Sequence, residues 1–128
     1  MTDEYDVILS STARSTQFVF KTSPLKLNQP YEVGLVSLQT NGLRRPKTSS
    51  MLVQMDNIAC SNLNDGQRPY LDIVYGNKPI NYFNPMYKKY NSNNLNTITI
   101  FLTEVDGCSP IVLGSILVRL HFRPCSST

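Results

Sequence analysis

Near its C-terminal end the chain contains a segment in which apolar and polar side chains alternate residue by residue. Successive side chains of a β-strand point to opposite faces of its sheet, so SILVRLHFR (115–123) is expected to form a two-faced strand. One face carries Ile116, Val118, Leu120 and Phe122. The other, partly solvated face carries Leu117, Arg119, His121 and Arg123. Such a strand buries its apolar face against a second layer, which constrains the chain to a layered β fold.

Short apolar runs interrupted by Pro, Gly and Asn recur along the chain at the spacing typical of all-β sandwiches and barrels. The segments expected to be strands are 5–11, 16–22, 31–39, 51–60, 69–76, 80–90, 97–105 and 115–122. Segment 51–60 is a weaker candidate that also fits a helical period, and Pro85 makes 80–90 an edge strand or an extended crossing segment. These strands predict an all-β fold, a single jelly-roll sandwich of about eight antiparallel strands.

Alternation also assigns faces within segment 31–39. One face is expected to carry Tyr31, Val33, Leu35 and Ser37. The opposite face is expected to carry Glu32, Gly34, Val36 and Leu38.

Length and charge narrow the function classes. A chain of 128 residues is expected to be one domain, 1–128. Only 16% of the residues are charged, below the typical ~25%, which suits a protein in contact with neighbours. The net charge of +3 is too small to indicate nucleic acid as a specific partner. The basic stretch GLRRPKTSS (42–50) is interpreted as a solvated loop or, alternatively, a tethering contact to acidic partners. No signal peptide or membrane span is predicted.

The histidine and cysteine content argues against a metal site. Cys60, Cys108 and Cys125 are dispersed, and they are interpreted as reduced thiols of an intracellular product. Together with a single histidine they cannot supply the closely spaced ligands of a zinc site. No metal or other cofactor is expected.

Motifs that would indicate catalysis are also missing from the sequence. G-x-S-x-G, a glycine-rich phosphate loop and H-E-x-x-H do not occur. His121 lies between two arginines and is interpreted as a structural residue of a strand, and the acidic N-terminal residues Glu4 and Asp6 are expected to fray. Glu104 and Asp106 flank a turn. We expect no enzyme; a small hydrolase that uses a pair of Asp or Glu carboxylates is the enzymatic alternative.

Aromatic and basic residues interleave in YFNPMYKKY (82–90). Such a pattern can stack single-stranded bases, but it also occurs at the rim of protein–protein interfaces, where tyrosine is enriched. We favour the interface. The candidate subunit-interface residues are Tyr82, Phe83, Tyr87, Tyr90, Arg44, Arg45, Arg119, His121 and Arg123.

Two blocks of the sequence carry a family resemblance. The first, FVFKTSPLKLNQPYEVGLVSLQ (18–39), matches at Phe20, Pro24, Leu25, Leu27, Glu32, Val33, Gly34 and Leu35, with Tyr31 in place of a usual Trp. The second block (84–123) matches at Asn84, Pro85, Tyr87, Ile98, Ile100, Asp106, Gly107, Leu120, His121, Phe122 and Arg123. In this order the two blocks resemble penton-type minor capsid proteins of Polinton (Maverick) elements and adintovirus-like viruses.

The resemblance implies a structural capsid protein with a single jelly roll. Copies of the chain would form a homopentamer at a capsid vertex, next to a neighbouring major capsid protein. The protein would belong to the virion and assemble inside the host cell, in the nucleus or cytoplasm. Family members are often longer, so this chain would be a minimal version without projecting insertions. The alternative is a β-sandwich recognition module that binds a glycan or receptor through the tyrosine-rich segment.

Overall fold

The structure is a computed structural model that describes residues 4–12, 15, 17–41, 50–59, 61–63, 66–74, 79–104, 111 and 114–125. These residues form eleven strands and no helix. In chain order they are β1 (Tyr5–Ser11), β2 (Gln17–Lys26), β3 (Tyr31–Asn41), β4 (Met51–Met55), β5 (Ser61–Leu63), β6 (Gly66–Arg68), β7 (Tyr70–Val74), β8 (Ile80–Asn81), β9 (Tyr87–Tyr90), β10 (Asn94–Thr103) and β11 (Ser115–Pro124).

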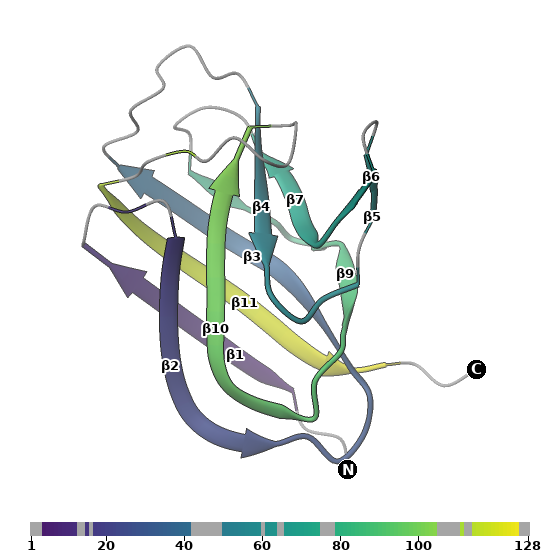
Figure 1. The fold of residues 1–128 in the computed structure, drawn as a ribbon. Helices are drawn as coiled ribbons and strands as arrows, with labels where there is room; N and C mark the ends of the chain where they lie inside the picture. Colours follow the sequence, from purple (N-terminus) through teal and green to yellow (C-terminus); the bar gives the residue numbers. More distant parts are fainter. Residues whose placement is uncertain are drawn as a thin grey trace.

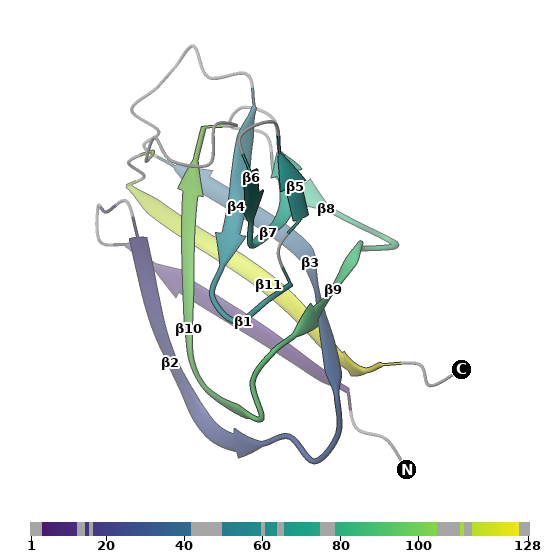
Figure 2. The ribbon, with the colours of Figure 1, turned by 45° about the vertical axis from the view of Figure 1, so that its right-hand side comes forward.

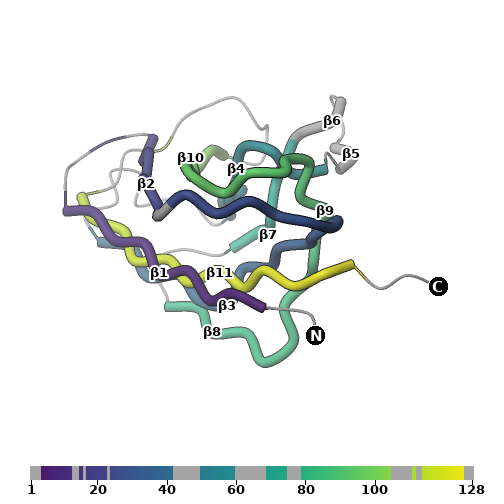
Figure 3. Tube along the Cα trace, turned by 90° about the horizontal axis from the view of Figure 1, so that it is seen from below, coloured from purple at the N-terminus to yellow at the C-terminus, as the bar shows by residue number. Residues whose placement is uncertain are grey.

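Two antiparallel sheets form the body of the protein. The five-stranded sheet, here called the β11 sheet, has the order β1-β11-β3-β8, and β9 also pairs with β3. The four-stranded sheet, the β10 sheet, has the order β2-β10-β4-β7. In Figure 1 the strands of the β11 sheet run diagonally behind those of the β10 sheet, and Figure 3 shows the two layers from below.

The strand pairing is nested. The first strand β1 pairs with the last strand β11, β2 pairs with β10, β3 pairs with β8 and β9, and β4 pairs with β7. A long antiparallel hairpin that folds over on itself produces this order, which is the jelly-roll topology. Since β8 and β9 share one position and β5–β6 form an added hairpin, the sandwich has eight positions. The predicted all-β jelly roll of about eight strands is confirmed.

The core lies between the two sheets, and β11 contributes to it as predicted. Its inward residues are at most 2% exposed: Ile116, Val118, Leu120 and Phe122. Phe122 meets the ring of Tyr90 edge-on, with the ring centroids 5.2 Å apart. Leu117, on the opposite face of β11, is 43% exposed.

The predicted faces of β3 are wrong beyond its middle. Arg119 pairs with Ser37, but the next residue of β11, Leu120, pairs with Leu35, so Val36 is an additional residue in β3. This β-bulge exchanges the faces of the residues that follow it. Leu38, expected on the outward face, is 3% exposed in the core, and Ser37 lies in the outward register instead.

Strand boundaries differ from the expected ones in two further places. β2 continues to Lys26 and includes Pro24. Proline cannot donate a backbone hydrogen bond, and it is tolerated here because β2 is an edge strand, with a neighbouring strand on one side only. The hairpin β5–β6 was not predicted, although Asp65-Gly66 is a turn signal. Segment 80–90 divides into β8 and β9, in agreement with the predicted edge or crossing segment. The basic stretch 42–49 lies outside the described residues.

Because one face of β11 is buried and the other is exposed, alanine substitutions on the two faces should lower the free energy of unfolding by different amounts. We expect Phe122→Ala to lower the free energy of unfolding by about 3 to 5 kcal/mol, because it leaves a cavity in a fully buried site. Leu117→Ala, on the outward face of the same strand, is expected to change it by less than about 0.5 kcal/mol. Urea denaturation of both variants measures the difference. Equal costs would contradict the assigned faces.

Candidate functional site

The outward face of the β11 sheet brings together polar residues from four segments of the chain. At one register position Asp6 of β1, His121 of β11, Gly34 of β3 and Tyr87 of β9 are cross-strand neighbours. Other charged residues of the same face adjoin this row. We call the whole group the outer-face cluster: Glu4, Asp6, Glu32, Gly34, Tyr87, Arg119, His121 and Arg123.

His121 is the centre of the cluster. Its Nδ1 is 2.6 Å from the hydroxyl oxygen of Tyr87, and its Nε2 is 2.8 Å from Oε1 of Glu4. The side chain is 20% exposed, and its ring meets that of Tyr87 nearly edge-on. The imidazole therefore links β9 to the residue that precedes β1, across β11 and β3.

Arg123 makes two contacts within the cluster. Its Nε donates a hydrogen bond to Oε2 of Glu32 at 2.5 Å, and its guanidinium lies over the ring of Tyr87, 3.5 Å from the centroid. The hydrogen bond with Glu32 raises the pKa of Arg123. Arg119 and Asp6 approach to 3.5 Å, but both side chains are about half exposed, so this pair contributes little to stability.

Gly34 lets the ring of Tyr87 lie close to β3. A Cβ atom at this position would be 3.1 Å from Cβ of Pro85 and 3.2 Å from two ring carbons of Tyr87. Both distances are shorter than ordinary van der Waals contact. The missing side chain of Gly34 is thus what allows the hydroxyl of Tyr87 to reach His121, because those two residues flank Gly34 on neighbouring strands.

The hydroxyl of Tyr87, the imidazole of His121 and the carboxylate of Glu4 contact one another in that order. The same order of groups occurs in enzymes, as a nucleophile, its general base and the acid that orients the base. Two observations disfavour such chemistry here. Burial raises the pKa of Tyr87, which disfavours the phenolate. The four described cavities are lined by other residues than Glu4, Tyr87 and His121. The arrangement links Glu4, which precedes β1, to β11 and β9 as a polar clamp between strands.

Sequence reasoning placed His121 correctly on the outward face between two arginines, but it missed the partners. Glu4 and Asp6 were expected to fray, and this prediction is wrong because they form ion pairs with His121 and Arg119. Glu4 and Asp6 lie more than a hundred residues from His121 and Arg119 in the sequence, and only the register of β1 on β11 brings them together.

The candidate interface residues differ in where the structure places them. Tyr87, Arg119, His121 and Arg123 belong to the outer-face cluster, and Phe83 is 97% exposed. Tyr82 is partly buried against the core. Arg44 and Arg45 lie outside the described residues.

Tyr90 is a correction, because it is 3% exposed and packs in the core. Alternation along β9 turns it inward when Tyr87 points outward. It cannot contribute to a subunit interface in this conformation.

The segment between β8 and β9 extends away from the body of the sandwich, as Figure 2 shows at its right-hand side. It carries two exposed apolar side chains, Phe83 at 97% and Met86 at 60%. Single exposed apolar residues are common on protein surfaces, but these two lie three residues apart on one protruding segment and together offer apolar area for a contact.

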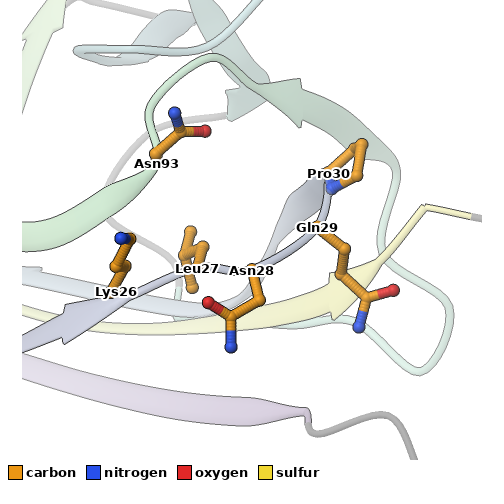
Figure 4. Close-up of a pocket in the computed structure, with 6 residues that line it drawn as sticks. All are labelled: Lys26, Leu27, Asn28, Gln29, Pro30 and Asn93. Carbon is orange, nitrogen blue, oxygen red and sulfur yellow. The ribbon is translucent and has the colours of Figure 1, made fainter.

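A separate cavity of about 370 Å³ lies at the turn between β2 and β3 (Figure 4). Its lining includes Asn28, Gln29 and Asn93, and the side chains of Leu27 and Asn28 point to opposite sides of the chain. Amide groups of this kind donate and accept hydrogen bonds. With Lys26 as the one ionisable residue in the lining, the cavity offers no acid–base pair.

The described residues hold no group of three or more His, Cys, Asp or Glu side chains that could bind a metal ion. Nowhere in this part of the chain is there a helix with the length and apolar character that a membrane crossing needs. Cys125 is a free cysteine, whereas Cys60, Cys108 and Asp106 lie outside the described residues.

The chain was compared with models of protein families and with curated proteins. No family model matches it, and the search of the curated proteins finds no match either.

The close approach of Tyr87 to Gly34 predicts a coupling between the two positions. We expect Gly34→Ala to destabilise the fold by about 1 kcal/mol, because the overpacking exceeds the gain from a less flexible unfolded chain. In a Tyr87→Ala background the cost should fall, since only the contact with Pro85 remains. A double-mutant cycle by urea denaturation measures the coupling energy. If the losses in free energy of unfolding of the two single variants simply add up in the double variant, Gly34 and Tyr87 are not in contact.

The buried hydroxyl of Tyr90 predicts that the fold loses stability at alkaline pH. Burial raises the pKa of Tyr90 above 10.0, and the carboxylate of Asp56 raises it further. Above about pH 10 the unfolded chain has released a proton that the folded chain still binds, so this tyrosine lowers the stability as the pH rises. Below about pH 10 its contribution to stability is fully present.

We therefore expect Tyr90→Phe to flatten the decline in the free energy of unfolding between about pH 9 and about pH 11. The substitution keeps the ring contact with Phe122 and removes only a hydroxyl 3.4 Å from the carbonyl oxygen of Asn94. Urea denaturation across this pH range provides the measurement. An unchanged pH dependence would show that Tyr90 titrates normally in the folded chain.

Proposed function

We propose that the chain is a structural capsid protein of the penton type, from a virus or a virus-like element. Copies of it assemble into a pentamer at a capsid vertex, next to a neighbouring major capsid protein. The protein acts by binding its own copies and catalyses no reaction.

One observation carries this proposal: residues of both blocks that resemble penton proteins contact one another. Glu32 and Gly34 come from the first block, and Tyr87, His121 and Arg123 come from the second. Arg123 contacts Glu32 and Tyr87, and Tyr87 crosses Gly34 to reach His121. Residues that carry a resemblance but are scattered over the sequence thus form a single structural unit on one face of the fold.

The jelly roll and the surface add support. Many unrelated functions share one fold, so the topology alone does not assign an assembly role. The charged fraction of 16% lowers the electrostatic repulsion between crowded copies, and Phe83 offers exposed apolar area for a contact. Both properties suit a chain that associates with its own copies.

The tyrosine-rich segment gives little support to the alternative function, a module that binds a glycan. Sugar rings stack on exposed aromatic faces, but Tyr90 is buried and the guanidinium of Arg123 lies over the ring of Tyr87. Tyr82 is also partly buried against the core. No open platform of tyrosines is formed by these three residues.

The state of association tests the proposal directly. We expect the purified protein to shift from monomer to pentamer with rising concentration, as measured by size-exclusion chromatography with light scattering. Negative-stain images should show rings with five-fold symmetry. A chain that stays monomeric at the highest soluble concentration would refute the capsid role, and a stable ring of another size would refute only the pentamer.

A further inference from the structure

The two margins of the β11 sheet carry opposite charges. β1 forms one margin, and β8 and β9 form the other. Within the described residues 4–12 the charged side chains are Glu4 and Asp6, and within 79–94 they are Lys88 and Lys89. Glu4 and Asp6 remain 58% and 52% exposed although each has a partner in the cluster. Each copy therefore presents an acidic margin and, across the sheet, a basic one.

The acidic margin adjoins a partly apolar groove on the open side of the sandwich. A cavity of about 360 Å³ lies between β1 and β2. Its lining includes the apolar side chains of Tyr5, Val7 and Leu25 and the polar residues Asp6, Lys21 and Thr22. The three apolar side chains pack only partly against the core, so some of their apolar surface lines the groove. Figure 3 shows β1 and β2 on the same side of the two layers.

A second cavity, of about 290 Å³, continues along the same two strands. It is lined by residues 10–11 of β1 and 17–20 of β2, together with Ser15. β1 and β2 are the outermost strands of their sheets, so each leaves one backbone edge without a partner strand in the described part of the chain. Such edges readily accept a neighbouring chain.

The basic margin carries the protruding segment with Phe83 and Met86. It lies opposite the groove, because β8 and β9 pair with the far edge of β3 while β1 lies beyond β11. One copy thus displays an apolar protrusion followed by the exposed Lys89, and a groove beside the carboxylates of Glu4 and Asp6. Lys21 also lines this groove, and Lys88 lies with its Nζ 4.7 Å from the centroid of the Tyr70 ring. The two surfaces are complementary in charge and in apolar character.

We propose that Phe83 and Met86 of one copy occupy the β1–β2 groove of the next copy, with Lys89 facing the margin of Glu4 and Asp6. This inference rests on the proposed self-assembly and identifies the surfaces that perform it. Because the two surfaces differ, the contact is head to tail. A head-to-tail contact closes into a ring when the rotation per subunit fits, and it leaves no free groove within the ring.

Two substitutions of exposed residues test the contact, one in the protrusion and one in the groove. Phe83→Ser removes the protrusion, and Ile8→Arg fills the groove from its rim, where Ile8 is 66% exposed. Each is expected to raise the dissociation constant about tenfold or more. Met86→Ser provides a second variant of the protrusion. The matched control is Leu117→Ser, an exposed apolar residue of the same sheet on neither margin, which should associate like the native chain.

Mixing the two defective variants tests the head-to-tail geometry. The Phe83→Ser copy retains its groove, and the Ile8→Arg copy retains its protrusion, so an equimolar mixture should form a 1:1 complex and no ring. Native mass spectrometry with one variant isotopically labelled identifies that complex, and circular dichroism checks that both variants fold.

The outcomes separate the two proposals. If the native chain forms rings and both variants do too, or if the mixture yields no complex, the groove contact is wrong while self-assembly stands. If the native chain stays monomeric under all conditions, the proposed function fails and this inference fails with it.

Discussion

The antiparallel pairing of β1 with β11 is the contact on which the other features depend. It joins the two ends of the described chain over the seven residues of β1. The pairing of the first strand with the last is what closes the nested order of the jelly roll, since β2 and β10, then β3 and β8–β9, follow inside it. The same pairing aligns Asp6 with His121 and brings Glu4 within reach of the imidazole. A shift of one residue would turn every side chain of β1 to the wrong face.

The two faces of β11 have different physical roles. Its inward face supplies the apolar burial that stabilises the fold, with Phe122 fully enclosed. Its outward face makes partly exposed ion pairs, and the half-exposed pair of Arg119 with Asp6 contributes at most about 1 kcal/mol. The hydrogen bond between Tyr87 and His121 contributes more to position than to stability, because it fixes the start of β9 against β11 across Gly34. The protruding segment before β9 is oriented by this anchor.

The alternation of apolar and polar residues within a strand predicted much of the fold. The features that it could not predict depend on how strands far apart in the sequence pair. The alternation in 115–123 gave the faces of β11 correctly, because one buried face imposes a period of two. The same reasoning failed in β3, where the bulge at Val36 inserts one residue that no local pattern signals. The partners of His121 were missed for a related reason: Glu4 and Tyr87 are distant in sequence, and three strand registers together decide that they meet. Tyr90 was misplaced because the alternation was not followed from Tyr87 to the end of β9.

In the proposed ring, the exposed Phe83 would serve association and not the stability of the monomer. At 97% exposure its ring gains almost nothing from the folded monomer, and it leaves apolar surface in water. Burying such a ring yields about 1.5 to 3 kcal/mol, and in a head-to-tail ring every subunit contributes one such burial and receives another. The gain is therefore repeated at each contact, while an open chain of copies leaves one protrusion and one groove exposed at its ends. Closure removes both exposed ends at once, so a contact that is weak between two copies favours the complete ring over any shorter assembly.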